Sequence, residues 1–301
     1  MELTGLHLLL TYRCTYECDH CFVWGSPRQH GTLTLAQMRE ILDQARDLGT
    51  VEWIYFEGGE PFLYYAALRR GVEMAADRDF KVGIVSNAYW ATADEDAVEQ
   101  LRPFAGRVQD LSLSCDAYHG DEEHRAQVDR ARRAAEELSI PCDVITIAQP
   151  DAAAVSDAVG QPAPGEYAVR FRGRAAEKLA ERAPKLAWSR FDECPYENLR
   201  NPGRVHIDPF GYVHVCQGIS IGNLSATPLS KICREYAPEA HPVVGPLLRG
   251  GPAQLIRDFG ITHDERYGDA CHLCDAARRT LRPRLQSILA PEQMYGAADG
   301  S

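Results

Sequence analysis

The sequence predicts an α/β fold with a parallel sheet. Strand-like and helix-like segments alternate along the chain. The strand-like ones are short and apolar or alternating, and in the longer helix-like ones apolar residues recur every three or four positions. Repeated alternation of this kind favours parallel strands joined by crossover helices. Six such units are too few to close an eight-stranded barrel. The strands are expected at residues 6–12, 52–57, 81–86, 108–116, 142–148 and 167–172.

The clearest helix is expected between the first two strands, at residues 34–48. Its apolar residues follow the 3.6-residue period and define one face that can pack on the sheet. The last helix of the series is expected at 175–186, a stretch rich in Ala, Arg and Lys. A chain of 301 residues has room for one large domain and a smaller one, which we place at 1–188 and 189–301. The apolar face of the first helix consists of Leu35, Met38, Ile41, Leu42 and Ala45.

The composition favours a cytoplasmic protein that binds neither nucleic acid nor membranes. The formal net charge is −11, whereas binding of phosphate backbones requires a basic surface. Two arginine-rich stretches, 130–133 and 278–284, are interpreted as solvated helix faces. No run approaches the roughly 18 apolar residues of a membrane span, and the N-terminal run LHLLL lacks the basic flank and cleavage site of a signal peptide. Ten cysteines in a reducing compartment indicate metal ligands or free thiols.

Three cysteines follow the first expected strand at the spacing Cys-x3-Cys-x2-Cys. Cys14, Cys18 and Cys21 lie in the segment CTYECDHC. A [4Fe-4S] cluster usually takes four thiolates, so three closely spaced cysteines suggest a cluster with one iron left open to another ligand. A zinc site is the alternative, although zinc sites are usually built from two Cys-x2-Cys or Cys/His pairs.

Together with a second motif, EGGEP at residues 57–61, this segment resembles the radical S-adenosylmethionine enzymes. The resemblance is carried by CTYECDHC, with His20 before the third cysteine, and by GGEP one βα unit later. It implies a partial (βα)6 TIM-like barrel that is open on one side. It also implies that the open iron binds the amino and carboxylate groups of S-adenosylmethionine, and that the glycines let the backbone approach this ligand closely. The residues expected to contact the cofactor here are His20, Gly58, Gly59, Glu60 and Pro61.

Polar residues at the ends of later strands extend the expected site, because α/β barrels carry their active sites at the carboxyl ends of their strands. Ser86 and Asn87 end the third strand, and alternation in LSLSCD places Ser112, Ser114 and Asp116 on one face of the fourth. The resemblance implies that Ser86, Asn87 and Ser114 help to hold the cofactor. Each of them could instead satisfy a local turn.

Charged and aromatic residues near the same strand ends are candidates for substrate chemistry. Arg170 and Arg172 resemble the end of the sixth strand in related enzymes, and either guanidinium could grip a carboxylate of cofactor or substrate. A salt bridge is the alternative for both. A catalytic base is expected on the same rim. The candidate bases are Asp116, Tyr118 and His119 after the fourth strand, and Glu57 at the end of the second.

A second group of four cysteines lies beyond residue 190. Between its first two members, RVHIDPFGYVHVC predicts a hairpin of two short strands joined by residues 208–211, where proline comes early and glycine late. The group resembles the Twitch or shortened SPASM extension of radical S-adenosylmethionine enzymes. This implies a small α+β extension with one auxiliary [4Fe-4S] cluster closed by four thiolates; a zinc ribbon is the alternative. The candidate ligands are Cys194, Cys216, Cys271 and Cys274.

The three remaining cysteines are expected to pack as small hydrophobic residues. Cys115 and Cys142 fall on expected strands, and Cys233 on a short amphipathic stretch. Cys233 is the alternative ligand if one of the four candidates is not used.

The function that the resemblance implies is radical chemistry on an unactivated carbon. An external one-electron reductant of flavodoxin or ferredoxin type would reduce the first cluster, which cleaves S-adenosylmethionine to methionine and a 5'-deoxyadenosyl radical. That radical abstracts hydrogen from the substrate, and the auxiliary cluster takes up an electron to complete an oxidation or a cross-link. The protein would orient the reactants and exclude water.

A ribosomally made peptide, modified after translation, is the first substrate class that we expect. The alternative is dehydrogenation of a small molecule such as an amino sugar or a cyclitol. The first strand begins close to Met1, so no leader-binding domain is expected before the barrel, and a separate protein could supply that function. Outside enzymology, an iron-sulfur carrier or a zinc-stabilised binding module is a candidate, although neither needs a cofactor cavity.

Overall fold

The computed structural model describes residues 1–152 and 165–297, and within them nine strands form one sheet in the order β10-β9-β8-β1-β2-β3-β4-β5-β6. Every pair from β8 to β6 is parallel, whereas β9 and β10 run antiparallel to their neighbours in this sheet. The expected α/β fold with a mostly parallel sheet is confirmed. The strands of this sheet are β1 (Gly5–Thr11), β2 (Trp53–Gly58), β3 (Lys81–Ser86), β4 (Asp110–Ser114), β5 (Cys142–Ile147), β6 (Gly165–Tyr167), β8 (Arg204–Ile207), β9 (Tyr212–Cys216) and β10 (Ile219–Asn223).

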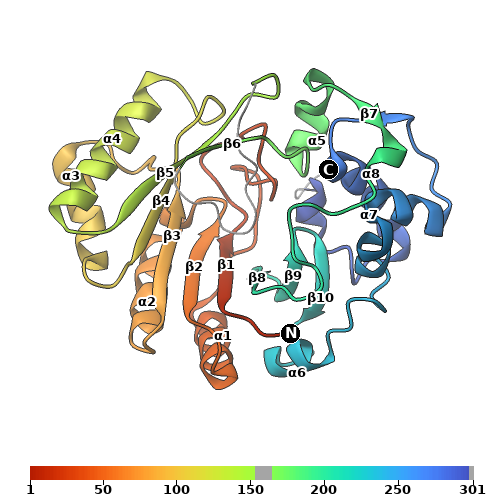
Figure 1. Cartoon of the computed structure of the whole chain (residues 1–301). Coiled ribbons are helices and arrows are strands. Elements are labelled where there is room, and N and C mark those ends of the chain that lie inside the picture. The colour runs from red at the N-terminus through yellow and green to blue at the C-terminus, as the bar shows by residue number, and fades with distance from the viewer. Residues whose placement is uncertain (153–164, 298–301) are drawn as a thin grey trace.

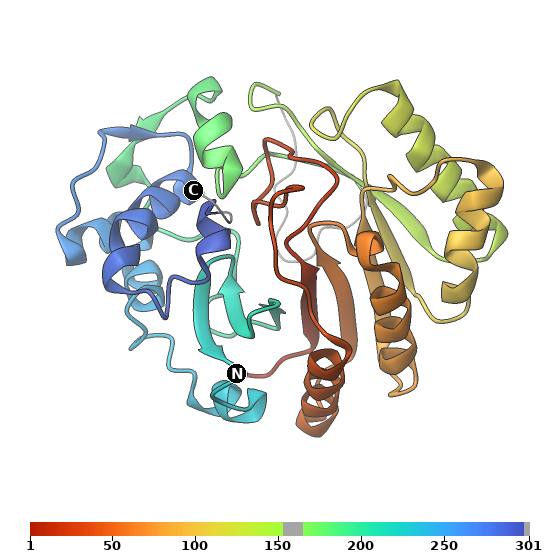
Figure 2. The same cartoon turned by 180° about the vertical axis from the view of Figure 1, so that it is seen from behind.

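Helices between these strands lie on the outside of the sheet (Figure 1), as the view from behind also shows (Figure 2). The first helix confirms the sequence expectation: Thr34 and Gln37 form a capping box at its start, and Gly49 ends it in the left-handed conformation. Its apolar face is buried except for Leu35 in the first turn, which is 42% exposed. The connecting helices are α1 (Leu35–Leu48), α2 (Tyr65–Ala76), α3 (Asp94–Leu101) and α4 (Glu122–Glu137).

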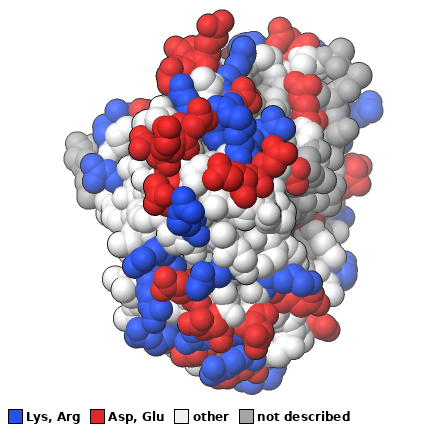
Figure 3. All heavy atoms as spheres, turned by 90° about the vertical axis from the view of Figure 1, so that its left-hand side faces the viewer, with Lys and Arg blue, Asp and Glu red and all other residues white. Residues whose placement is uncertain are grey.

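The surface formed by α3 and α4 carries charges of both signs, interspersed with one another (Figure 3). The arginine-rich stretch 130–133 lies on α4, where Arg130 pairs with Glu123 at 3.2 Å and Arg133 pairs with Asp94. Each basic side chain thus has an acidic neighbour. This agrees with a solvated helix face, and the described residues form no continuous basic surface on this side. For the second stretch the expectation is wrong at Arg278, which is only 4% exposed.

The sixth strand ends earlier than expected. Pairing with β5 stops at Tyr167, and residues 168–172 leave the sheet. Their backbone is used elsewhere: the amide of Phe171 donates to Asp269 Oδ2 at 3.1 Å, and the amide of Arg172 donates to the carbonyl of Arg170. The chain turns here towards the C-terminal half, so Arg170 and Arg172 lie outside the sheet.

The helix expected at 175–186 is also shorter. α5 covers Arg174–Lys178, a 3₁₀ turn follows at Ala180–Arg182, and Leu186–Ala187 forms the short strand β7. Pro184 explains why no helix continues beyond the 3₁₀ turn, because proline disfavours a helical conformation in the residue before it, and Ala183 is extended. β7 pairs with β11 (Arg266–Tyr267) in a separate two-stranded sheet.

The expected hairpin is present and joins the main sheet. β8 (Arg204–Ile207) and β9 (Tyr212–Cys216) pair antiparallel, and β10 (Ile219–Asn223) follows. The sequence did not indicate that β8 also pairs with β1, in parallel, so that β1 lies between β2 and β8. The hairpin therefore extends the same sheet that carries the N-terminal strands.

Three helices follow the hairpin strands, on the side of the molecule opposite α2 to α4 (Figure 1). α7 is interrupted where Gly250 and Gly251 leave the helical conformation. Among the described residues, no helix combines the length and apolarity needed to cross a membrane. The three helices are α6 (Leu229–Glu235), α7 (Val244–Phe259) and α8 (Ala270–Leu281).

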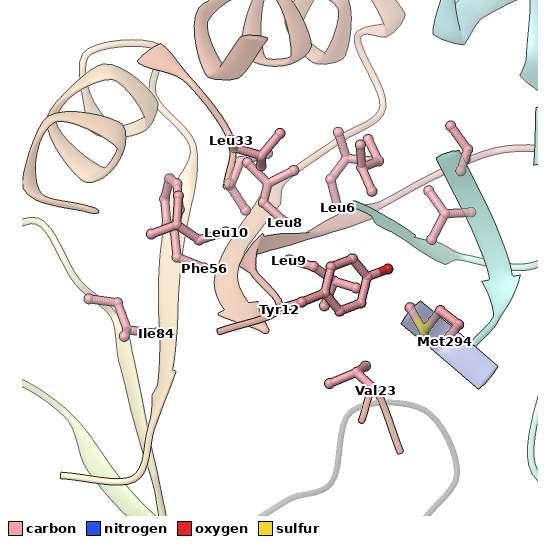
Figure 4. Close-up of a cluster of buried hydrophobic side chains, with 14 of the residues drawn as sticks. Leu6, Leu8, Leu9, Leu10, Tyr12, Val23, Leu33, Phe56, Ile84 and Met294 are labelled. Carbon is pink, nitrogen blue, oxygen red and sulfur yellow. The ribbon is translucent and has the colours of Figure 1, made fainter. Parts of the chain in front are cut away.

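The hydrophobic core is centred on β1, all seven residues of which are buried. Leucines from this strand contribute to a cluster with Phe56 of β2 and Ile84 of β3 (Figure 4). A strand buried on both faces reads as a continuous apolar run, which is why LHLLL shows no alternation.

Asp208, at the hairpin turn, anchors β1 to the hairpin. Its Oδ2 accepts a hydrogen bond from the Tyr12 hydroxyl at 2.9 Å and lies 3.2 Å from His214 Nε2. Its Oδ1 accepts the backbone amides of Phe210 and Tyr212, each at 2.9 Å. Burial, and then the charge of Asp208, raise the pKa of Tyr12 well above its usual value. Four donors compensate the cost of burying the Asp208 carboxylate, but removing the carboxylate would leave these donors unpaired.

Replacing Asp208 with alanine should therefore lower the free energy of unfolding by about 3 kcal/mol, because several buried donors lose their acceptor at once. Urea denaturation of wild type and variant, with equal metal content, measures this. Asp129→Ala, which removes an exposed partner of Arg132, is the control and should change stability by less than about 0.5 kcal/mol. Equal effects of the two substitutions would contradict the role of Asp208.

Candidate functional site

A cavity of about 250 Å³ lies at the carboxyl ends of the parallel strands. It is lined by residues that follow β1, β2, β3 and β4, as expected for an α/β protein of this kind. Most of the residues singled out in the sequence meet here. They are Cys14, Cys18, His20, Cys21, Gly58, Gly59, Ser86, Asn87, Ser114, His119, Arg170 and Arg172, together with Glu57.

The first three cysteines share one wall of this cavity. Two of the sulfurs accept backbone amides: Cys14 from Tyr16 at 3.4 Å and Cys21 from Gly25 at 3.2 Å. Burial raises the pKa of the Cys14 thiol to about 12 and raises that of Cys18 further, and neighbouring thiolates add to both effects. Three such thiolates repel one another unless a cation lies between them. The donor set therefore fits a metal-sulfur group.

The segment that carries these cysteines is held by Arg174, which the sequence analysis did not select. This side chain is 3% exposed, and its Nη1 and Nη2 donate to the carbonyls of Cys18 at 2.7 Å and Gly25 at 2.9 Å. Its backbone amide donates to the carbonyl of Cys21 at 3.0 Å. The preceding Gly173 has φ of 59°, and a Cβ there would lie 2.7 Å from the Cys21 carbonyl oxygen. No local pattern in the sequence indicates that Gly173 and Arg174 contact the first cysteine segment.

The two glycines of GGEP are required by close backbone contacts. A Cβ on Gly58 would lie 2.4 Å from the carbonyl oxygen of Thr11, and one on Gly59 would lie 2.0 Å from that of Arg13. The amide of Gly59 donates to the Thr11 carbonyl at 2.6 Å, and that of Glu60 to the Arg13 carbonyl at 2.8 Å. The motif therefore runs directly beside the chain that leads into the cysteines.

Glu60 and Pro61 are not among the residues that line the cavity. The Glu60 carboxylate points to the end of β3, where it accepts the Ser86 hydroxyl at 2.9 Å and the amides of Asn87 at 2.8 Å and Phe62 at 3.0 Å. Burial raises its pKa to about 7 despite these hydrogen bonds. Its visible role is to fix the ends of β2 and β3 together.

Asn87 connects the end of β3 to the cysteine segment. Its Nδ2 donates to Thr15 Oγ1 at 3.1 Å and lies 3.6 Å from Cys14 Sγ. Ser86 is occupied locally, since its Oγ also accepts Trp90 Nε1 at 2.9 Å. Ser114, on β4, lines the cavity as the alternation predicted.

Of the three candidate bases after β4, His119 lines the cavity, whereas Asp116 and Tyr118 lie behind the wall. Asp116 contacts His119 Nδ1 at 2.8 Å and His20 Nε2 at 3.5 Å. Burial would raise the pKa of Asp116, but the two histidines outweigh it and hold the carboxyl ionised. Burial lowers the pKa of His20 to about 4, so its ring is neutral and stacks on Tyr118 at 4.7 Å between centroids. Tyr118 donates its hydroxyl to the carbonyl of Ala148 at 3.1 Å.

A second cluster of one carboxylate and two imidazoles lies at the cavity, and the sequence indicated only its carboxylate. Glu57 contacts His7 Nδ1 at 3.2 Å and His206 Nε2 at 3.0 Å, and all three residues are buried. Burial opposes ionisation of Glu57, but the two histidines hold its pKa well below the usual range. Glu57 was a candidate base from its position, whereas the histidines were missed. The pairing of β8 with β1, which the sequence did not reveal, places His206 opposite His7.

The second group of cysteines lines a smaller cavity. Cys194, Cys216, Cys271 and Cys274 all lie on its wall, with Arg172 and Arg278 beside them. Burial raises the pKa of Cys194 to about 12 and that of Cys274 to about 11, and in both cases Cys216 adds to the effect. Four convergent thiols, one on a buried and three on partly buried residues, fit a metal or an iron-sulfur cluster that is closed on all sides.

The other three cysteines lie outside both cavities. Cys233 is on α6, where its carbonyl accepts the N-terminal amine of Met1 at 2.9 Å. Cys115 directly follows β4, and Cys142 is the first residue of β5. The alternative use of Cys233 as a ligand is therefore not favoured by its position.

The fold and the site define the class to which this region belongs. Residues 8–141 match the sequence profile of the Radical SAM superfamily, so this part of the chain is a radical SAM domain. Binding of S-adenosylmethionine and of an iron-sulfur cluster is supported by this match and by the three convergent thiols.

Two curated relatives cover part of the chain. An S-adenosylmethionine-dependent nucleotide dehydratase of Selenomonas ruminantium is 38% identical over 84 residues, which are 27% of this chain and 29% of that protein. YydG of Bacillus subtilis, named for peptide biosynthesis, is 29% identical over 111 residues, 36% of this chain and 35% of its own length. The alignments thus span about a third of each relative.

A solved structure extends the likeness over most of the chain. Streptococcus suis SuiB bound to S-adenosylmethionine superposes with a TM-score of 0.53 at 16% identity, covering 85% of this chain and 74% of that one. At this identity the likeness concerns the fold.

The buried state of His206 leads to a pH-dependent prediction. Burial lowers its pKa to about 4, whereas an unfolded histidine titrates near about 6.5. As pH falls from 6.5 towards 4, the unfolded chain therefore takes up a proton that the folded protein does not, and stability is lost. His206→Gln should lose about 2 kcal/mol less stability than wild type between pH 7 and pH 5.

Urea denaturation without oxygen at the two pH values measures this difference. Glu57 has the same sign but acts at lower pH: its pKa is lowered in the folded state, so its contribution is present above the unfolded value of about 4.3 and is lost below it, outside the range measured. His263→Gln, which changes a histidine outside the cavity, should retain the wild-type pH dependence. An identical loss in wild type and His206→Gln would refute the buried neutral state of His206.

Proposed function

We propose that the chain is a radical S-adenosylmethionine enzyme that abstracts hydrogen from its substrate and completes the reaction by passing an electron to an auxiliary cluster. The single observation that carries this proposal is the meeting of three thiols, the GGEP backbone and polar strand ends at one cavity. The radical SAM domain at 8–141 supports it. In this proposal residues 1–188 form a partial barrel for the cofactor, and 189–301 form a Twitch or SPASM-like unit.

The first cluster would be held by Cys14, Cys18 and Cys21, with its fourth iron open to S-adenosylmethionine. When bound, the cluster supplies one electron to cleave the cofactor to methionine and a 5'-deoxyadenosyl radical. The chain's own residues would orient the cofactor: the lack of a Cβ at Gly58 and Gly59 lets their backbone lie against the segment that leads into the cysteines, and both residues line the cavity. His20, Asn87 and Ser114 line the same space and are the polar contacts that we propose.

The second cluster would be held by Cys194, Cys216, Cys271 and Cys274. Four thiolates leave no iron free for a substrate, so we assign it to electron transfer. The ten cysteines form no disulfides, which suits a reducing cytoplasm and a partner reductant of flavodoxin or ferredoxin type.

The substrate must also lose a proton if it is oxidised. Two groups at the cavity can accept one: His119, oriented by Asp116, and Glu57, held between His7 and His206. We propose these as the base candidates. Asp116 would act through His119, and Tyr118 would support the ring of His20.

A peptide is the substrate class that we propose first, because the relative YydG is named for peptide biosynthesis. A separate leader-binding protein could then present the peptide. A small molecule is the second candidate, and the nucleotide dehydratase relative favours it. Incubating the loaded enzyme with each class and following 5'-deoxyadenosine release above the background would separate the two.

Metal content and cofactor cleavage test the proposed function directly. Reconstituted without oxygen, wild type should hold about eight irons per chain and form 5'-deoxyadenosine under reductant. Joint replacement of Cys14, Cys18 and Cys21 with alanine should leave about four irons and abolish cleavage. Joint replacement of Cys194, Cys216, Cys271 and Cys274 should also leave about four irons but retain cleavage.

Cys115→Ala and Cys142→Ala provide the controls, since both thiols lie outside the two cavities, and each should keep both clusters. Zinc in place of iron, with no cleavage, would reject the enzyme. Zinc only at the second group would reject the electron-transfer role but keep the radical chemistry.

A further inference from the structure

Arg172 lies between the two cavities. It lines the larger one beside the first cysteine segment and the smaller one beside the second cysteine group. Its guanidinium carbon is 5.2 Å from the centroid of Phe22, the residue after Cys21. On the other side, its Nη1 is 3.7 Å from Cys216 Sγ. Arg172 is thus the side chain that touches both a ligand of the second group and the neighbour of a ligand of the first.

Glu197 holds this guanidinium in place and connects it to the larger cavity. Its Oε1 is 3.5 Å from Arg172 Nη1, and its Oε2 is 3.3 Å from Arg204 Nη2. Arg204 lines the larger cavity. The side chains of Arg172 and Glu197 are 13% and 11% exposed, so solvent screens this row of charges only weakly. The row leads from the cavity to a thiol of the second group.

A cation with N–H groups directed at a cluster sulfur favours the more negative, reduced state of that cluster. Hydrogen bonds to the sulfurs and nearby charge are main determinants of iron-sulfur reduction potentials. Arg172 supplies both at Cys216. Arg278, at the other end of the same cavity, acts on a different thiol: its charge and hydrogen bond partly offset the effect of burial on the pKa of Cys274. It does not line the larger cavity, and its Nη1 donates to the carbonyl of Gln217 at 2.6 Å.

We propose that Arg172 is a positioning residue that raises the reduction potential of the auxiliary cluster and so makes that cluster the electron acceptor for the cavity. This inference rests on the proposed function. In the step concerned, the substrate radical loses one electron and one proton. The electron would be taken up by the [4Fe-4S] cluster that Cys194, Cys216, Cys271 and Cys274 would hold, which would go from the 2+ to the 1+ state. The proton goes to a base at the cavity, and a flavodoxin or ferredoxin-type carrier later reoxidises the cluster.

Potentiometric titration followed by electron paramagnetic resonance tests the inference. The holoprotein is used, and the Cys14, Cys18 and Cys21 triple alanine variant serves as background so that the auxiliary signal is seen alone. In Arg172→Gln the one-electron equilibrium should shift at least tenfold towards the oxidised cluster, which is 59 mV to more negative potential. Arg172→Lys keeps the charge but loses the planar fork, so it should restore part of the shift.

Two further variants separate the effect of the Arg172 contact with Cys216 on the potential from the effect of any nearby charge. Arg204→Gln removes a positive charge from the same row without touching a thiol, and it should move the potential less than Arg172→Gln. Glu197→Gln removes the anion beside Arg172, and the potential should move in the positive direction. This opposite sign keeps the test decisive if Arg172→Gln loses its cluster.

An auxiliary potential that is unchanged in Arg172→Gln, or that shifts equally in Arg204→Gln, would overturn the inference while leaving the proposed function intact. If Arg172→Gln does not retain four irons per chain, a Glu197→Gln potential that does not rise would overturn it in the same way. A wild type with no paramagnetic second cluster would overturn both.

Discussion

The rest of the site depends on the interaction by which Arg174 holds the first cysteine segment. Its guanidinium binds the carbonyls of Cys18 and Gly25, which precede it by 156 and 149 residues. Residues 14–26 contain neither helix nor regular strand, so their shape is set by contacts with other parts of the chain. A buried arginine with five donors in a fixed plane is suited to this, since it can satisfy several carbonyls at once. Because these carbonyls flank the thiols, the direction of the sulfurs follows from where Arg174 lies.

The same contact links the two cysteine groups. Next to Arg174, the amide of Gly173 donates to Asp275 Oδ1 at 3.4 Å, and Asp275 lies one residue after Cys274 on α8. Asp275 also binds Arg279 Nε at 2.6 Å, and Arg279 lies over Trp24 of the first segment. A displacement of α8 would therefore shift the segment that carries the first three cysteines. This explains in physical terms why the N-terminal half and residues beyond 190 form one hydrogen-bonded assembly around the cavity.

The sequence predicted the elements that local residue patterns determine, and it missed the features that depend on contacts between distant segments. The position of β3, the extent of α1 and the turn after β8 follow from apolar periodicity and turn residues nearby. The cysteine segment and GGEP meet because parallel strands end on one rim. In contrast, the strand expected at 167–172 stops pairing at Tyr167, and the amide of Phe171 donates instead to Asp269 in the C-terminal half. Arg174 and His206 carry no local signal, because their partners come from elsewhere in the chain.

The arrangement of charge suggests how proton and electron could leave the cavity together in the proposed reaction. Glu57 lies between His7 and His206, and Arg204 is two residues before His206 on β8. From Arg204, the pair with Glu197 leads to Arg172 and Cys216. An electron that moves to the auxiliary cluster would make that end more negative, while the proton taken up at the cavity would make the cavity end more positive. Both ends are buried, where unscreened separation of charge is costly. In the proposed reaction, Arg204, Glu197 and Arg172 between the two ends would lower that cost.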